Sequence, residues 1–131
     1  MIRRLLLLLV IMLPSKVAAQ DLLPTSCDSA TTTFDMRRCA SRALEDAKRD
    51  LNRYVREARR LAAKPALLDS AQAVWERFRE IACRAAGSEY EGGTMMPLVV
   101  LSCHLDLTRS RLHQVYDDYL RTSDTALPQP K

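Results

Sequence analysis

Few side chains in this sequence have the types and spacing that catalysis requires. Glu76 and Glu80 lie four residues apart, so on a helix they would share one face, as paired carboxylates in acid–base catalysis can. Such pairs are common on solvated helices, and no Ser/His/Asp order or phosphate-cradling glycine pattern accompanies them. The sequence therefore predicts a protein that is not an enzyme.

The other reactive side chains are four cysteines: Cys27, Cys39, Cys83 and Cys103. No Cys-x-x-Cys spacing occurs and the only histidines are His104 and His113, so we predict no metal site and no cofactor. Four cysteines in a short exported chain predict two disulfides. We favour nearest-neighbour pairing, which would join Cys27 to Cys39 and Cys83 to Cys103. A bridge from Cys39 to Cys83 or Cys103 is the alternative.

Residues 1–19 have the pattern of a cleaved signal peptide. Arg3 and Arg4 precede an apolar run over residues 5–13, and Val17, Ala18 and Ala19 are the small residues that a signal peptidase reads. This run is too short to span a bilayer, which takes roughly 20 residues. We expect cleavage near Ala19, export to the periplasm or beyond, and no transmembrane segment afterwards.

The charge balance excludes two classes of partner. The chain has 20 basic and 16 acidic residues. Arg3, Arg4 and Lys16 would leave with the signal peptide, so 17 basic and 16 acidic residues would remain and the net charge would be close to zero. Nucleic acids and anionic membranes both require a concentrated basic face, so neither is expected as a partner.

The elements that must position these residues are helices. Thr32 and Asp35 form a capping pattern before an amphipathic run that ends at Lys64-Pro65. Its apolar positions recur at steps of three and four, which is typical of one helical face: Met36, Cys39, Ala43, Ala47, Leu51, Tyr54, Ala58 and Leu61. The opposite face is rich in arginine and is expected to be solvated, with Glu45 and Arg49 as an ion pair.

Two further helices are predicted after Pro65. The second has the apolar stripe Leu68, Ala71, Trp75, Phe78 and Ala82, with Trp75 as a core anchor and Gly87 as a left-handed terminator. The third begins at Pro97, and its stripe comprises Leu98, Leu101, Leu105, Thr108, Leu112, Val115 and Tyr119. With no alternating strand pattern, the sequence predicts an all-α antiparallel three-helix bundle over residues 20–121, followed by a disordered polar tail over residues 122–131.

Polar residues on these helices have expected structural partners. We expect the Thr108 hydroxyl to bond a backbone carbonyl one turn back, because it interrupts an apolar seam. Arg79 borders the apolar face and is expected to bond loop carbonyls or a carboxylate such as Glu76 or Asp106. Arg111 is expected to complete a polar cluster with Glu80 or Glu76.

The loop between the second and third helices is the candidate partner-binding segment. It contains Ser88, Glu89, Tyr90, Glu91, Gly92, Gly93 and Thr94. For its glycines, however, the favoured explanation is a tight connection between the two helices, as a bridge from Cys83 to Cys103 would require. A bridge from Cys83 to Cys103 would hold the loop rigid, which lowers the entropy lost on binding, and Tyr90 would be its anchor.

The order of these motifs resembles the LprI-type lysozyme inhibitor domain, an exported bacterial four-cysteine helical domain. The resemblance covers roughly residues 27–115, and its most specific part is AQ-x-x-W-x-x-F-R-E-x-x-C over residues 71–83, followed by Gly92-Gly93-Thr94 and Cys103. The spacing from Leu51-Asn52 to Tyr54 is one residue shorter than in the family pattern. The family-motif residues to which we assign structural roles are Gln72, Trp75, Phe78, Arg79, Glu80, Thr108 and Arg111.

The resemblance implies an exported protein that inhibits lysozyme or a related muramidase by binding it. Electrostatics argue mildly against this, since lysozymes are generally basic and the mature chain has no net negative charge, although Glu89 and Glu91 supply local acidity. The alternative is a periplasmic protein-interaction or accessory module with no lysozyme activity, which would use the surface of the first or third helix instead.

Overall fold

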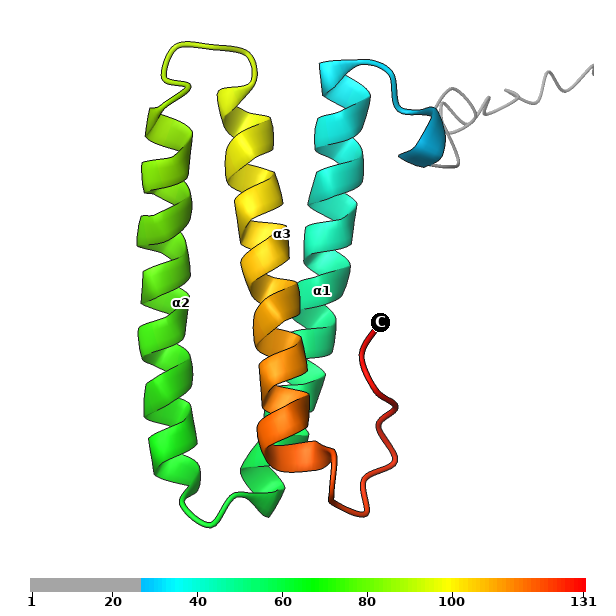
Figure 1. Ribbon diagram of the computed structural model, residues 1–131, viewed down its shortest axis with the longest axis vertical. Helices are drawn as coiled ribbons and strands as arrows, with labels where there is room; N and C mark the ends of the chain where they lie inside the picture. Colours follow the sequence, from blue (N-terminus) through cyan, green and yellow to red (C-terminus); the bar gives the residue numbers. More distant parts are fainter. Residues whose placement is uncertain (1–26) are drawn as a thin grey trace, which may run out of the picture.

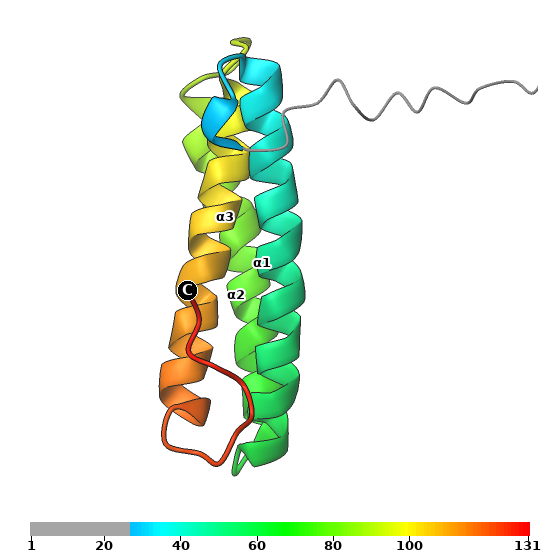
Figure 2. The same cartoon turned by 90° about the vertical axis from the view of Figure 1, so that its right-hand side faces the viewer.

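The chain folds as an all-α antiparallel three-helix bundle, seen in a computed structural model that describes residues 27–131. The helices are α1 (Thr33–Leu61), α2 (Pro65–Ser88) and α3 (Met96–Val115), with a short 3-10 turn, η1 (Cys27–Ser29), before α1 (Figure 1). Turning the bundle by 90° shows that it is long and narrow (Figure 2). The predicted signal peptide lies outside the described residues. Within residues 27–131, every helix is too short or too polar to cross a lipid bilayer.

The start of α1 follows the predicted capping pattern. The Thr32 side chain accepts a hydrogen bond from the Asp35 amide at 3.1 Å, and its hydroxyl donates to Asp35 Oδ2 at 2.6 Å. The inward face buries Leu44, Ala47, Leu51, Tyr54 and Ala58. At the two ends of the predicted stripe, Met36 and Leu61 are instead exposed.

The arginine-rich face of α1 is solvated, as predicted, but its ion pairs have a different spacing. Lys48 bonds Glu45 at 3.1 Å, and Arg49 bonds Asp46 rather than Glu45. Such three-residue pairs recur along the helix. Because their side chains are largely exposed, each contributes little to stability.

The inward face of α2 is more polar than the sequence predicts. Its buried residues are Leu68, Gln72, Cys83 and Gly87, whereas Phe78 is 55% exposed. Placing Phe78 in the core was therefore wrong. The helix is rotated so that Gln72 and Arg79 face α3, where polar partners on α3 compensate for their burial.

Gly87 has a different role from the predicted helix terminator. It lies within α2 with no positive φ, and a Cβ added there would lie 2.5 Å from Val100 Cγ2 of α3. The absence of a side chain therefore lets α2 and α3 approach closely at this end.

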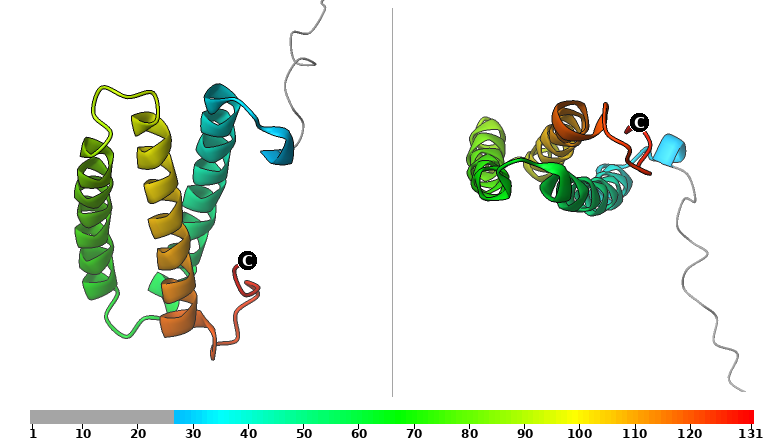
Figure 3. Two further views of the ribbon diagram at one scale, coloured as in Figure 1. Left: turned by 45° about the horizontal axis from the view of Figure 1, so that its top comes forward. Right: turned by 90° about the horizontal axis from the view of Figure 1, so that it is seen from below.

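Helix α3 is the central element of the bundle. It packs against both α1 and α2, which contact each other only slightly (Figure 3). Its buried residues, Thr108, Leu112 and Val115, belong to the predicted seam, and a π-helical turn, η2 (Tyr116–Leu120), continues it. The main core lies at this end of the bundle, where Leu112, Val115 and Leu120 contact buried residues of α1 and Leu68 of α2.

The C-terminal tail packs on the bundle, which differs from the predicted disorder. Leu127 lies against the core, and the Tyr54 hydroxyl donates to the Pro128 carbonyl at 2.5 Å. In Figure 2 the tail turns back and runs along the outside of the bundle. Leu127 is one of the few apolar residues in a polar segment, and it provides this anchorage.

The two disulfides join nearest neighbours in the sequence, as favoured above. Cys27 pairs with Cys39, with 5.7 Å between the Cα atoms, and ties η1 to the first turns of α1. Cys83 pairs with Cys103, with 5.4 Å between the Cα atoms, and joins α2 to α3.

Candidate functional site

The loop between α2 and α3 is built from consecutive turns. The Tyr90 amide donates to the Gly87 carbonyl at 3.0 Å, and the Gly93 amide donates to the Tyr90 carbonyl at 3.0 Å. Gly92 has φ of 76°, a conformation that L side chains rarely adopt, so glycine is strongly favoured at this position. The loop is therefore a defined structure rather than an open connection.

Both sides of the loop are held by tertiary contacts. The fully buried Cys83 bonds Cys103 across the two helices that the loop connects. The close contact of Gly87 with Val100 lies between the disulfide and the loop. Together these contacts place the two ends of the loop at a short, constant separation, which reduces its conformational freedom.

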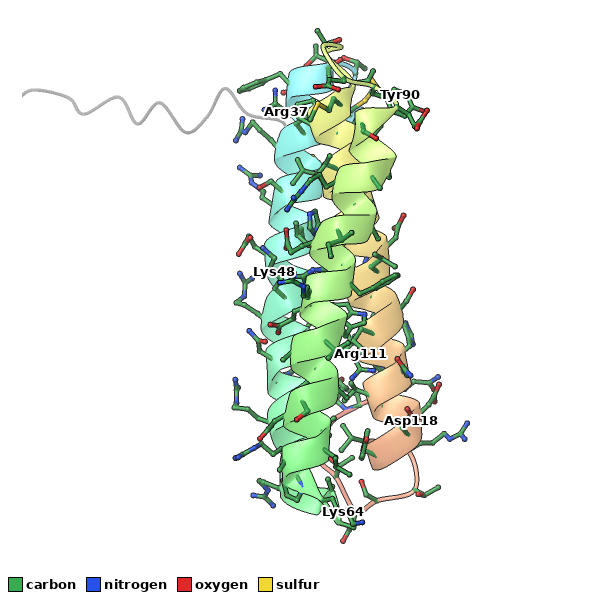
Figure 4. All side chains as sticks on the ribbon, turned by 90° about the vertical axis from the view of Figure 1, so that its left-hand side faces the viewer. Arg37, Lys48, Lys64, Tyr90, Arg111 and Asp118 are labelled. Atoms are coloured by element: carbon green, nitrogen blue, oxygen red, sulfur yellow. A yellow bond between two sulfur atoms is a disulfide. The ribbon has the colours of Figure 1, made fainter. Side chains whose placement is uncertain are left out.

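The loop presents an apolar anchor between acidic groups. Tyr90 is 50% exposed and projects from the end of the bundle (Figure 4), and the neighbouring Glu89 and Glu91 are also exposed. Met95 and Met96, at the start of α3, add exposed apolar surface beside it. Exposed aromatic and methionine side chains of this kind are enriched in protein interfaces. Of the predicted loop residues, Ser88 belongs to the end of α2, where its hydroxyl donates to the Ala85 carbonyl at 2.6 Å.

A polar cluster around Trp75 lies further along the α2–α3 interface. The Arg79 guanidinium lies over the Trp75 ring, 4.9 Å from its centroid, and Arg79 Nη1 donates to Thr108 Oγ1 at 3.1 Å. The Thr108 hydroxyl donates in turn to the His104 carbonyl at 2.6 Å, one turn back, as predicted. The Arg79 side chain is only 12% exposed, so these contacts compensate for burying its charge.

The second half of the cluster joins Arg111 to Gln72. Arg111 Nε donates to Gln72 Oε1 at 3.1 Å, and its guanidinium lies 5.9 Å from the centroid of the Trp75 ring. Trp75 is thus contacted by two arginines while it packs, partly buried, against the core. Figure 4 shows Arg111 at the side of α2, where α3 passes behind it.

Two of the predicted partners in this cluster were wrong. Arg79 bonds the Thr108 hydroxyl and lies 3.6 Å from Glu80, rather than contacting Glu76 or Asp106. Arg111 bonds Gln72 and Gln114 rather than Glu80 or Glu76. Two glutamine amides replace the expected carboxylates at Arg111, whereas Arg79 combines the Thr108 hydroxyl with a carboxylate that was not among the expected ones, Glu80. The helical spacing alone does not distinguish these partners.

His104 is a member of this region that the sequence did not single out beyond the question of metal binding. Its Nδ1 lies 3.9 Å from Glu80 Oε1, and its side chain is 14% exposed. Burial lowers the pKa of His104 below its usual 6.5, as do the nearby charges of Arg79 and Lys48, while the Glu80 carboxylate acts in the opposite direction. Its position four residues before Thr108 places His104 on the same face of α3, and this spacing is the sequence signal that could have identified it.

The cluster is organised to hold α2 on α3. Glu76 accepts a hydrogen bond from Gln72 at 3.4 Å and Glu80 lies against Arg79 and His104, so both carboxylates of the predicted pair have partners. Within the described residues, no group of three or more His, Cys, Asp or Glu side chains could hold a metal ion. Unlike the cluster, the loop of residues 88–94 is exposed along its whole length.

Comparison with known proteins supports the resemblance drawn from the motifs. The family model described as lysozyme inhibitor LprI matches residues 26–115. An uncharacterized protein of Rhizobium meliloti (strain 1021) is 32% identical over 101 residues, which cover 65% of this chain and 72% of that relative. No solved structure matches the chain significantly.

Proposed function

Because the chain belongs to the LprI lysozyme inhibitor family, we propose that it is an exported protein that binds a lysozyme or a related muramidase and blocks its cleft. The loop of residues 88–94 is the proposed contact surface. The observation that carries this assignment is the exposure of Tyr90 on a loop whose ends are clamped by the Cys83–Cys103 disulfide.

A clamped loop is suited to enter a cleft. Its turn hydrogen bonds and the conformation of Gly92 are present before binding, so little further ordering is required when a partner is engaged. Tyr90 supplies a rigid amphipathic anchor, and Glu89 and Glu91 lie on either side of it to pair with basic groups of a cationic lysozyme.

Export is consistent with the cysteine chemistry. Both disulfides lie within the described domain, and disulfides form and persist in oxidising compartments such as the periplasm or the extracellular space. We infer that the signal-like segment of residues 1–19 directs the chain there.

The test is a lysis assay with protein purified from the periplasm of an exporting host. A micromolar excess of the wild-type protein should slow the lysis of peptidoglycan by lysozyme, and Tyr90→Ala should abolish the effect. Phe34→Ala is the matched control, since Phe34 is a 65% exposed aromatic residue at the start of α1. The control should inhibit as the wild type does.

A negative result has a definite meaning in this design. No slowing of lysis at micromolar excess by the folded wild-type protein overturns the lysozyme assignment. Capture of an envelope protein that survives Tyr90→Ala would then favour the alternative, an accessory module that binds through the surface of α1 or α3.

A further inference from the structure

The outer face of α2 carries an apolar stripe that no part of the described chain covers. The stripe consists of Leu67, Ala71, Val74, Phe78, Ile81 and Ala85, all of which are exposed. Leu67 is 64% exposed, Val74 71%, Phe78 55% and Ile81 54%. We call this surface the α2 stripe. It is distinct from the face that contacts α3, which buries Leu68, Gln72 and Cys83.

The spacing of the α2 stripe is that of a coiled-coil seam. Its members follow one another at steps of four and three residues in strict alternation, which are the steps between a and d positions of a heptad. No charged residue interrupts it. Helix α2 therefore has one face that packs on α3 and a second apolar face, the α2 stripe, that is available to another helix.

The sizes of the side chains favour a second copy of α2 as the occupant. When two copies are placed antiparallel about a twofold axis at Glu76, Val74 faces Phe78 of the second copy. Ala71 then faces Ile81, and Leu67 faces Ala85. Every layer combines a larger with a smaller side chain. A parallel pairing would instead oppose Ala71 to Ala71 and Phe78 to Phe78, which leaves gaps and crowding along one seam.

The available surface is enough for a weak dimer. The α2 stripe extends over residues 67–85, about 27 Å along the helix. The exposed parts of its side chains amount to on the order of 1,000 Å² for two copies, the lower limit of specific interfaces. The antiparallel arrangement also places opposite ends of the two helix dipoles side by side.

We propose that the protein forms a reversible homodimer in which the α2 stripes of two copies pair antiparallel. The dimer does not depend on the proposed function. Ser88 lies about 18 Å along the helix from the axis at Glu76, so the loops of residues 88–94 lie at opposite ends of the dimer and stay free.

Sedimentation velocity over a range of protein concentrations tests the proposal. The wild-type protein should associate to a dimer with a dissociation constant in the micromolar range. Val74→Glu and Phe78→Lys should each weaken dimerisation on the order of 100-fold or more, because each buries an unpaired charge twice in the interface. Circular dichroism should show that both variants stay folded, because both side chains are exposed in the monomer.

A double variant examines the antiparallel register directly. Val74→Glu combined with Phe78→Lys places opposite charges in both central layers, so dimerisation should recover. Val74→Glu combined with Ala85→Lys pairs no opposite charges in this register and should stay monomeric. Phe34→Glu is the control for a charge placed at an exposed aromatic residue of another helix, and it should dimerise like the wild type.

Three outcomes would overturn the proposal. The first is a wild-type protein that stays monomeric into the millimolar range. The second is a dimer that is insensitive to Val74→Glu and Phe78→Lys. The third is a monomer that binds lysozyme or another protein only while the α2 stripe is intact, which would assign this surface to a different partner.

Discussion

Arg79 and Thr108 meet across the α2–α3 interface, where Arg79 Nη1 donates to Thr108 Oγ1 at 3.1 Å while the Thr108 hydroxyl donates to the His104 carbonyl at 2.6 Å. One hydroxyl thus serves as acceptor for a nearly buried guanidinium and as donor to a backbone carbonyl of its own helix. One nitrogen of the guanidinium, Nε, is buried with no hydrogen-bond partner among the described residues. The hydrogen bond to Thr108 is therefore important in compensating for the burial of Arg79.

Thr108→Val should lower the free energy of unfolding by about 1–3 kcal/mol, because the isosteric change leaves a buried donor of Arg79 without its acceptor. Urea denaturation followed by circular dichroism measures the loss. Thr108→Ser keeps the hydroxyl and should lose less than Thr108→Val. Equal stability of Thr108→Val and the wild type would show that the hydrogen bond contributes nothing.

Gly87→Ala should destabilise the fold by about 1–3 kcal/mol, because the new Cβ would lie 2.5 Å from Val100 Cγ2. Val100→Ala removes the opposing atom, so the double variant should be more stable than the sum of the two single changes predicts. A double-mutant cycle from thermal unfolding measures this coupling. Strict additivity would contradict the close approach of α2 and α3 at this point.

The stability of the protein should fall as the pH is lowered from about 7.5 to 5.5. Burial lowers the pKa of folded His104 below the 6.5 expected when unfolded, so the unfolded state binds a proton more readily in this range. The stabilisation is thus fully present above the unfolded pKa and declines as the pH falls through it. His104→Gln should make this part of the stability profile flatter. An NMR titration midpoint of His104 above 6.5 would contradict the argument.

Replacing both Cys83 and Cys103 by alanine should cost about 3 kcal/mol of stability and should loosen the loop selectively. Hydrogen exchange of the Tyr90 and Gly93 amides should accelerate beyond the global change in stability, because both donate within the clamped loop. The matched variant, Cys27→Ala with Cys39→Ala, should lose a similar stability without this selective acceleration. Equal exchange rates of these two amides in both variants would show that the Cys83–Cys103 disulfide is not what orders the loop.

Much of the architecture could be predicted because its signals are local. Thr32 caps α1 through the amide of Asp35, and Pro65 is the first residue of α2, shortly after α1 ends at Leu61. The heptad spacing of the α2 stripe was also present in the sequence, but two of its members, Ala71 and Phe78, were assigned to the inward face instead. Phe78 was placed inside because its three-residue spacing from Trp75 suits a buried face, but its spacing from Val74 and Ile81 equally suits an exposed seam.

By itself, the sequence determined the number and approximate ends of the helices, since these depend on capping and proline geometry. It favoured nearest-neighbour pairing of the cysteines but left a bridge from Cys39 to Cys83 or Cys103 open, and the structure decided between them. Only the tertiary structure decided which face of α2 turns inward. Gln72 is buried there and Arg79 nearly so, because Arg111 and Thr108, more than 25 residues away on α3, supply their hydrogen bonds. A polar residue is stable in a core position only where another residue supplies its hydrogen bonds. Which residue does so depends on how one helix packs on another.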